Sequence, residues 1–175
     1  FSAKNLGADS FHRLSPQPAL SLDMWGTYFT PAREKQNILM GYSLGGSLGL
    51  HALLAHPHCW QGAIFISTHP GLSDLKKRQE RSERDRIWAD RFLSEPWETL
   101  MNDWNSQPVL ATSKWLERKE ENYSRLELSQ MLTTWSLGKQ EDLRCALSQV
   151  EVPILWITGE NDHVYTALAQ SRSLA

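Results

Sequence analysis

A serine bracketed by glycines, at residues 41–45, lies between a short apolar stretch and a run of small residues typical of a helix. The stretch Ile38 to Met40 predicts a strand, and the small residues after the serine predict a helix that ends near His56 and Pro57. A second apolar stretch, residues 63–67, predicts another strand. Strand, helix and strand in this order indicate a parallel βαβ unit with buried strands, so an α/β fold is expected.

The serine segment reads Gly41-Tyr42-Ser43-Leu44-Gly45, which fits the Gly-x-Ser-x-Gly pattern of a nucleophile elbow. In an elbow the serine lies on a strained strand-to-helix turn, and its neighbours must be small; we interpret Gly41 and Gly45 in this way. The backbone N–H of Leu44, at the start of the helix, is the expected donor to an oxyanion. Ser43 is therefore the candidate catalytic residue, and a glycine-rich turn without a catalytic role is the alternative.

The composition changes after this unit, because almost every residue from Lys76 to Arg86 is charged. Pairs such as Arg81 with Asp85 have the i,i+4 spacing of a solvated helix. An apolar face formed by residues 87, 88, 92 and 93 predicts that this helix docks at its C-terminal end. We expect a helical cap over residues 72–145, inserted between core segments 1–71 and 146–175. Further helices of this cap are expected over residues 97–104, 113–121 and 124–137.

A third apolar stretch, Ile154 to Thr158, predicts a strand that ends in the acidic turn Gly159-Glu160-Asn161-Asp162. The elbow pattern orders its triad as serine, acid and histidine, and Asp162 stands where the acid belongs. An acidic turn or a helix N-cap is the alternative role for Asp162. His163 is adjacent to Asp162, so their side chains should diverge, and it is a poor candidate for the triad base.

The overall composition limits what the chain can bind. With 18 Lys and Arg against 20 Asp and Glu, its formal charge of -2 argues against a generic partner such as nucleic acid or an acidic membrane. No apolar run approaches the roughly 20 residues that span a bilayer. Cys59 and Cys145 form neither a metal-ligand spacing nor a disulfide framework. We expect no metal, no cofactor and no membrane insertion, and the lack of a signal-peptide pattern favours a cytoplasmic location.

The elbow and several longer segments resemble the α/β-hydrolase superfamily and, within it, the menaquinone-pathway synthases of 2-succinyl-6-hydroxy-2,4-cyclohexadiene-1-carboxylate. The elbow is shared by the whole superfamily, whereas the cap segments are more specific, and the resemblance runs from about residue 37 to the end. It implies part of an α/β-hydrolase parallel sheet with an inserted helical cap, incomplete at both ends. The segments are Gly41-Tyr-Ser-Leu-Gly-Gly, His69-Pro-Gly-Leu, residues 80–96, residues 103–109 and Gly159-Glu-Asn-Asp.

This resemblance implies a lyase that eliminates pyruvate from 2-succinyl-5-enolpyruvyl-6-hydroxy-3-cyclohexene-1-carboxylate, with Ser43 as the base and no cofactor. It implies that Ser43 and Asp162 are triad members and that the histidine lies beyond Ala175. Ser47 stands where the family often has arginine, which bears on the identity of the substrate. Arginine binds carboxylates in a bidentate manner, which suits a polycarboxylate substrate. The residues implied to line the substrate cleft are Tyr42, Arg81, Trp104 and Arg125.

Two other functions remain open from the sequence. The same elbow would serve a serine esterase or a C–C hydrolase acting on small molecules. Alternatively, the absence of a suitable histidine favours a truncated or degenerate hydrolase-fold protein without catalysis.

Overall fold

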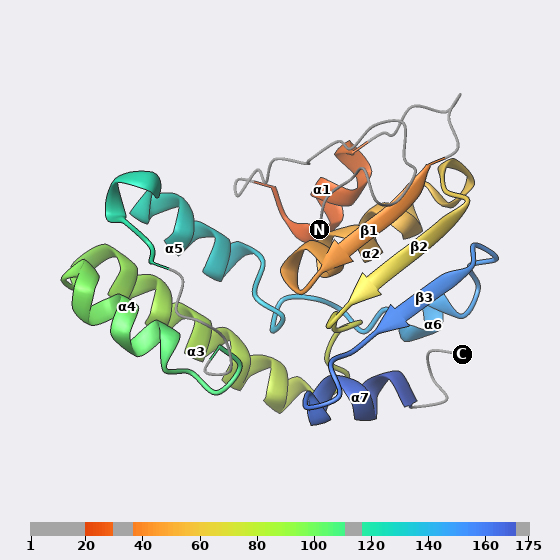
Figure 1. Ribbon diagram of the computed structural model, residues 1–175. Helices are drawn as coiled ribbons and strands as arrows, with labels where there is room; N and C mark the ends of the chain where they lie inside the picture. The colour runs from red at the N-terminus through yellow and green to blue at the C-terminus, as the bar shows by residue number, and fades with distance from the viewer. Residues whose placement is uncertain (1–19, 30–36, 111–116, 171–175) are drawn as a thin grey trace.

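The computed structural model describes residues 20–29, 37–110 and 117–170. Within these ranges three strands form one parallel sheet in the order β1-β2-β3 (Figure 1). The carboxyl ends of all three strands therefore lie at the same edge of the sheet. The predicted strands and their parallel pairing are confirmed. The strands are β1 (Ile38–Tyr42), β2 (Gly62–Ile66) and β3 (Ile154–Ile157).

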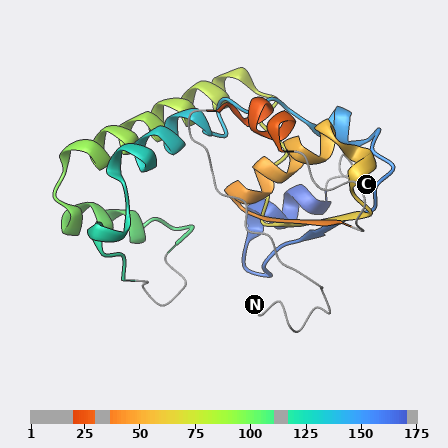
Figure 2. The same cartoon turned by 90° about the horizontal axis from the view of Figure 1, so that it is seen from above.

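One face of the sheet is covered by helices. Figure 2 shows α1 (Leu22–Tyr28) and α2 (Leu44–Ala55) on the same side of the strands. Helix α2 lies directly on the sheet and is followed by a short 3-10 turn, η2 (Pro57–Cys59). Phe65 of β2 is fully buried under α2 and its ring packs on that of Trp156, with centroids 5.4 Å apart. The main core therefore lies between α2 and this face.

The opposite face is apolar but open. Ile38, Met40 and Tyr42 of β1 are 59%, 44% and 67% exposed, and Leu155 and Ile157 of β3 are also exposed. The prediction of buried strands is thus correct for one face only. Parallel strands are apolar on both faces because helices usually cover both.

Between β2 and β3, every regular element that the structure describes is helical. Figure 1 shows α3, α4 and α5 beside the carboxyl edge of the sheet. The chain leaves and re-enters the core at one place, because the N–H of Leu143 donates to the carbonyl of Pro70 at 2.8 Å. This closure supports the predicted cap over 72–145, whose boundaries stay a prediction. The elements are α3 (Leu75–Ser94), α4 (Trp97–Asn105), η3 (Glu120–Asn122), α5 (Arg125–Thr134) and α6 (Arg144–Leu147), with α7 (His163–Gln170) after β3.

Two of the expected cap helices differ from the prediction. The helix expected over 113–121 is wrong where the structure describes it, because residues 117–119 have no regular structure and residues 120–121 belong to the 3-10 turn η3; residues 113–116 lie outside the described ranges. Helix α5 ends at Thr134, three residues before the expected end at Leu137. The backbone of Trp135 leaves the helical conformation there, and its buried indole donates to the carbonyl of Leu20 at 2.7 Å.

The face by which helix α3 docks agrees only in part with the one expected, because Phe92 is buried and Trp88 packs against its cluster, whereas two other predicted residues are exposed. Ile87 and Leu93 are 49% and 52% exposed, whereas Asp85, Ala89 and Phe92 are buried. The buried positions follow the i, i+4, i+7 spacing of one helix face. The charged residue Asp85 can be part of that face because it accepts hydrogen bonds from Arg81 and Ser136.

We predict that Trp135→Phe lowers the free energy of unfolding by about 1–3 kcal/mol, because the carbonyl of Leu20 loses its hydrogen-bond donor. Urea unfolding measures the change. Trp60→Phe is the control, because the indole of Trp60 makes a longer bond of 3.4 Å to Ala52 and should matter less. Equal losses in the two variants would contradict the prediction.

Candidate active site

Ser43 occupies the turn between β1 and α2, as predicted. Its φ of 51° and ψ of -119° are unusual for a residue with a side chain. Its N–H donates to the carbonyl of Ile66 at 2.9 Å, which extends the β1–β2 pairing into the turn. Ser43 is exposed, and its hydroxyl has no hydrogen-bond partner among the residues that the structure describes. The strained turn therefore presents this hydroxyl at the carboxyl edge of the sheet.

The glycines of the elbow have unequal roles. A Cβ at Gly41 would lie 2.6 Å from the Cα of Gly46, and a Cβ at Gly46 would lie 1.8 Å from Oγ1 of Thr68. A Cβ at Gly45 would meet no described atom within 4 Å. The interpretation of Gly41 as a required small residue agrees with these distances. For Gly45 it does not, and the steric constraint falls on Gly46 instead.

Leu44 is the first residue of α2, and its N–H has no acceptor within the described ranges. The first N–H groups of a helix lack intrahelical partners and carry partial positive charge. This arrangement suits the predicted oxyanion donor, which stays a prediction.

Asp162 follows β3 and caps helix α7. Its Oδ1 accepts from the N–H of Tyr165 at 3.2 Å, and its own N–H donates to the carbonyl of Gly159 at 3.0 Å. The helix-cap role considered for Asp162 is thus present in the structure. Oδ2 makes no hydrogen bond to the described residues, so an additional role as the triad acid stays a prediction. Since β2 separates β1 from β3, the strands that carry Ser43 and Asp162 lie about 10 Å apart.

Tyr165 and His69 lie at the same edge and are absent from the predicted site residues. Their rings meet edge to face, with centroids 6.4 Å apart. Burial raises the pKa of Tyr165; Asp162 and Tyr42 raise that pKa further, and the Arg81 cation opposes them. Three predicted site residues therefore lie within electrostatic reach of Tyr165. The sequence offered one signal for Tyr165: it is an aromatic residue in the first helical turn after the candidate acid Asp162.

His69 follows β2 in a fixed tautomer. Its Nδ1 accepts from the N–H of Gly71 at 3.0 Å, so a neutral ring carries its proton on Nε2. Burial lowers the pKa of His69, and the nearby cations of Arg144 and Arg81 lower that pKa further. The ring is therefore neutral at pH 7.

Arg81 reaches this edge from α3 of the cap. Its Nε donates to both carboxylate oxygens of Asp85, at 3.0 and 2.8 Å. Its Nη1 and Nη2 make no hydrogen bond within the described part of the chain, and the side chain is 36% exposed. These two nitrogens can therefore bind a carboxylate, which is what the predicted role requires.

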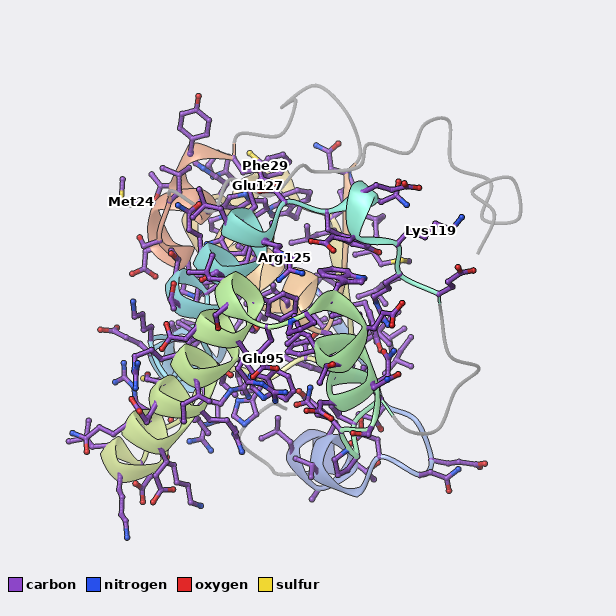
Figure 3. The ribbon with its side chains drawn as sticks, turned by 90° about the vertical axis from the view of Figure 1, so that its left-hand side faces the viewer. Met24, Phe29, Glu95, Lys119, Arg125 and Glu127 are labelled. Atoms are coloured by element: carbon purple, nitrogen blue, oxygen red, sulfur yellow. The ribbon has the colours of Figure 1, made fainter. Side chains whose placement is uncertain are left out.

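Trp104 and Arg125 are half-buried among the helices of the cap. The ring of Trp104 meets those of Trp88 and Phe92 edge to face, with centroids 5.0 and 5.3 Å apart. Nη1 of Arg125 donates to the carbonyls of Phe92 and Glu95, and Figure 3 shows its place between the cap helices. No hydrogen bond, ion pair or ring contact joins either side chain to the described residues around Tyr165. Their role in substrate binding stays a prediction.

The described ranges hold no group of three or more His, Cys, Asp or Glu side chains arranged to bind a metal ion. They also hold no helix with the length and apolar character needed to cross a membrane.

A parallel sheet in which a strained serine turn leads into a helix, with an acid-bearing loop two strands away, defines the α/β-hydrolase type of fold. The model of the family described as serine aminopeptidase, S33 matches residues 24–175, and the chain belongs to this family.

Several similar proteins carry the name 2-succinyl-6-hydroxy-2,4-cyclohexadiene-1-carboxylate synthase. One from Enterobacter sp. (strain 638) is 38% identical over 137 residues, covering 75% of this chain and 53% of the relative. Another from Yersinia pestis bv. Antiqua (strain Nepal516) is 33% identical over 177 residues, covering 97% of this chain and 62% of the relative. The structure of MenH from S. aureus superposes with a TM-score of 0.71 at 25% identity, covering 82% of this chain and 56% of that one. The chain thus spans a little over half the length of these relatives, and the predicted resemblance is confirmed.

We predict that Gly46→Ala destabilises the protein by about 1–3 kcal/mol, because its Cβ overlaps Thr68, which is buried. Gly45→Ala is the matched control in the same helical turn and should be neutral or stabilising by up to about 1 kcal/mol. Chemical unfolding of both variants measures the difference. Greater damage from Gly45→Ala would show that the constraint is assigned to the wrong glycine.

The lowered pKa of His69 predicts a pH dependence of stability. As the pH falls below the ordinary histidine pKa of 6.5, the unfolded chain takes up a proton that the folded protein does not. Stability should therefore fall between pH 7 and 5, and it should fall less in His69→Asn. Urea midpoints across this range test the prediction, and parallel profiles for the original protein and His69→Asn would contradict it.

Proposed function

We propose that this chain carries part of the active site of a lyase that eliminates pyruvate from 2-succinyl-5-enolpyruvyl-6-hydroxy-3-cyclohexene-1-carboxylate in menaquinone biosynthesis. The observation that carries the proposal is the pair of Nη groups on Arg81, which have no hydrogen-bond partner among the described residues and lie close to Tyr165 at the edge where Ser43 is presented. Such a donor pair matches a carboxylate of the substrate. The names and similarity of the relatives support the same assignment.

In the proposed reaction Ser43 acts as the base that removes a proton from the substrate, and pyruvate then leaves. The oxyanion that develops accepts a hydrogen bond from the N–H of Leu44. Arg81 orients a carboxylate, with Tyr42, Trp104 and Arg125 as the further substrate contacts. Asp162 is the proposed triad acid. The scheme also requires a histidine beside Ser43, and none of the described side chains makes that hydrogen bond.

A serine hydrolase acting on an ester or a C–C bond is the second candidate. The match to a family described as a serine aminopeptidase favours it, because hydrolysis uses the same elbow with Ser43 as nucleophile. The two candidate functions differ in their substrates: the lyase requires a carboxylate that Arg81 can bind, whereas the hydrolase can act on a neutral substrate.

We predict that pyruvate release depends on Ser43. In a coupled assay for pyruvate, Ser43→Ala should lower kcat by about 10²- to 10⁴-fold, the range expected when a positioned proton-transfer group is lost. Ser73→Ala, at an exposed site, should leave kcat unchanged. The assay is run on this chain and on a longer form that covers the full length of the relatives. Equal rates for the original protein and Ser43→Ala in the active form would exclude Ser43 as the base.

We predict that Arg81→Ala raises KM for the polycarboxylate about 10- to 100-fold, because hydrogen bonds to a charged group contribute about 1.5–3 kcal/mol. Hydrolysis of a neutral ester should be unaffected. Arg84→Ala, on the same helix and exposed, is the control. A loss that is equal for both substrates would favour a general structural role for Arg81 and count against the lyase.

A further inference from the structure

Asp85 is a charged residue in the interior of the cap. It is 5% exposed, and burying a carboxylate is costly unless donors compensate its charge. Arg81 supplies one donor, since its Nε lies 3.0 and 2.8 Å from the two oxygens. Ser136 supplies another, since its hydroxyl donates to Oδ2 at 2.7 Å. The carboxylate is therefore held from α3 on one side and from the end of α5 on the other.

The direction of the Ser136 hydroxyl is fixed as well. Its oxygen accepts from the N–H of Gly138 at 3.0 Å, which leaves its single hydrogen for Asp85. The turn formed by residues 136–138 packs closely against α3, because a Cβ at Gly138 would lie 2.3 Å from the carbonyl oxygen of Arg78. Nε of Arg78 in turn donates to the carbonyl of Gly138 at 3.2 Å. A continuous chain of hydrogen bonds thus runs from the turn through Ser136 and Asp85 to Arg81.

The way Arg81 uses its donors differs from the other ion-paired arginines in the described ranges. Arg86, Arg91 and Arg144 each bind a carboxylate through an Nη group as well as Nε. Arg125 binds the carboxylate of Glu120 through Nε alone, but its Nη1 is taken by two carbonyls. Arg81 also uses Nε alone, and neither of its Nη groups makes a hydrogen bond to the residues that the structure describes. These two groups are thus available for a bidentate interaction with another carboxylate.

We propose that Asp85 and Ser136 are positioning residues, which fix the guanidinium of Arg81 so that its Nη groups are ready to bind a carboxylate of the substrate. The proposal rests on the proposed function, because it takes Arg81 as a substrate contact. Fixing the guanidinium in advance removes the rotamer freedom that a long side chain would otherwise lose on binding. The packing of α3 against the end of α5 thereby sets the affinity for the carboxylate.

Binding of a tricarboxylate probe tests the proposal without requiring turnover. Titration calorimetry with tricarballylate compares the unaltered protein with Arg81→Ala, Asp85→Asn and Ser136→Ala. Binding of tricarballylate should disappear in Arg81→Ala. Asp85→Asn and Ser136→Ala should each weaken binding about 3- to 10-fold, which corresponds to the energy of a single hydrogen bond. Ser136→Thr keeps the hydroxyl and should restore affinity. Asp90→Asn, at an exposed ion pair on the same helix, is the matched control.

Two comparisons separate positioning from a structural role. In the Arg81→Ala background, Asp85→Asn should have no further effect on affinity, because it acts through Arg81. The Nε–H resonance of Arg81 in ¹⁵N NMR spectra should exchange slowly with water, and it should lose this protection in Asp85→Asn and Ser136→Ala. Circular dichroism confirms that each variant is folded before it is titrated.

The outcomes distinguish the two proposals. Binding that disappears in Arg81→Ala but is unchanged in Asp85→Asn and Ser136→Ala would overturn the positioning role and leave the proposed function intact. Absence of binding by the unaltered protein would overturn the carboxylate site, and with it both the substrate class and the positioning role.

Discussion

The close approach of helix α2 to the sheet determines where the candidate site residues lie. Gly46 and Gly49 leave room for Thr68 and for the ring of Phe65, since a Cβ at either glycine would come within 2.9 Å of these side chains. The helix can then begin directly after β1, which forces Ser43 into its strained turn. Its first N–H groups consequently point toward the same edge of the sheet as the ends of β2 and β3. The serine, the donor and the acid-bearing loop are brought to one edge by backbone packing.

The cap is joined to this edge by polar contacts. Its two ends meet where Leu143 bonds Pro70, and the backbone of Gly71, with φ of 114°, passes so close to Glu141 that no side chain fits between them. From this junction α3 runs past Tyr165 and His69, which brings Arg81 to the edge of the core. The cap is therefore anchored to the core at a place separate from the elbow.

Local signals in the sequence were enough to predict the strands, the parallel pairing, the elbow and α4. They failed where the deciding partner is distant along the chain. Gly46 rather than Gly45 is constrained because Thr68, on the next strand, lies against it. Asp85 looks like one more charge on a solvated helix until Ser136, 51 residues later, is placed beside it. The docking face of α3 was predicted only in part for the same reason: Trp88 and Phe92 pack inward as expected, but a buried ion pair at Asp85 does not produce an apolar pattern.

Arg81 and Asp85 together carry no net charge, so a carboxylate that reaches them meets directed N–H donors more than an uncompensated cation. His69 adds no charge because its ring is neutral at pH 7, and Arg144 nearby is paired with Asp142. Ser47 adds none either, at the position where the resembling family often has arginine. At the proposed site, recognition of a carboxylate would therefore depend on the orientation of a few donors more than on a general positive field. In this proposal the hydrogen bonds behind Arg81 set the orientation of its donors, and a lyase that binds a carboxylate would need them more than a hydrolase that uses the same serine on neutral substrates.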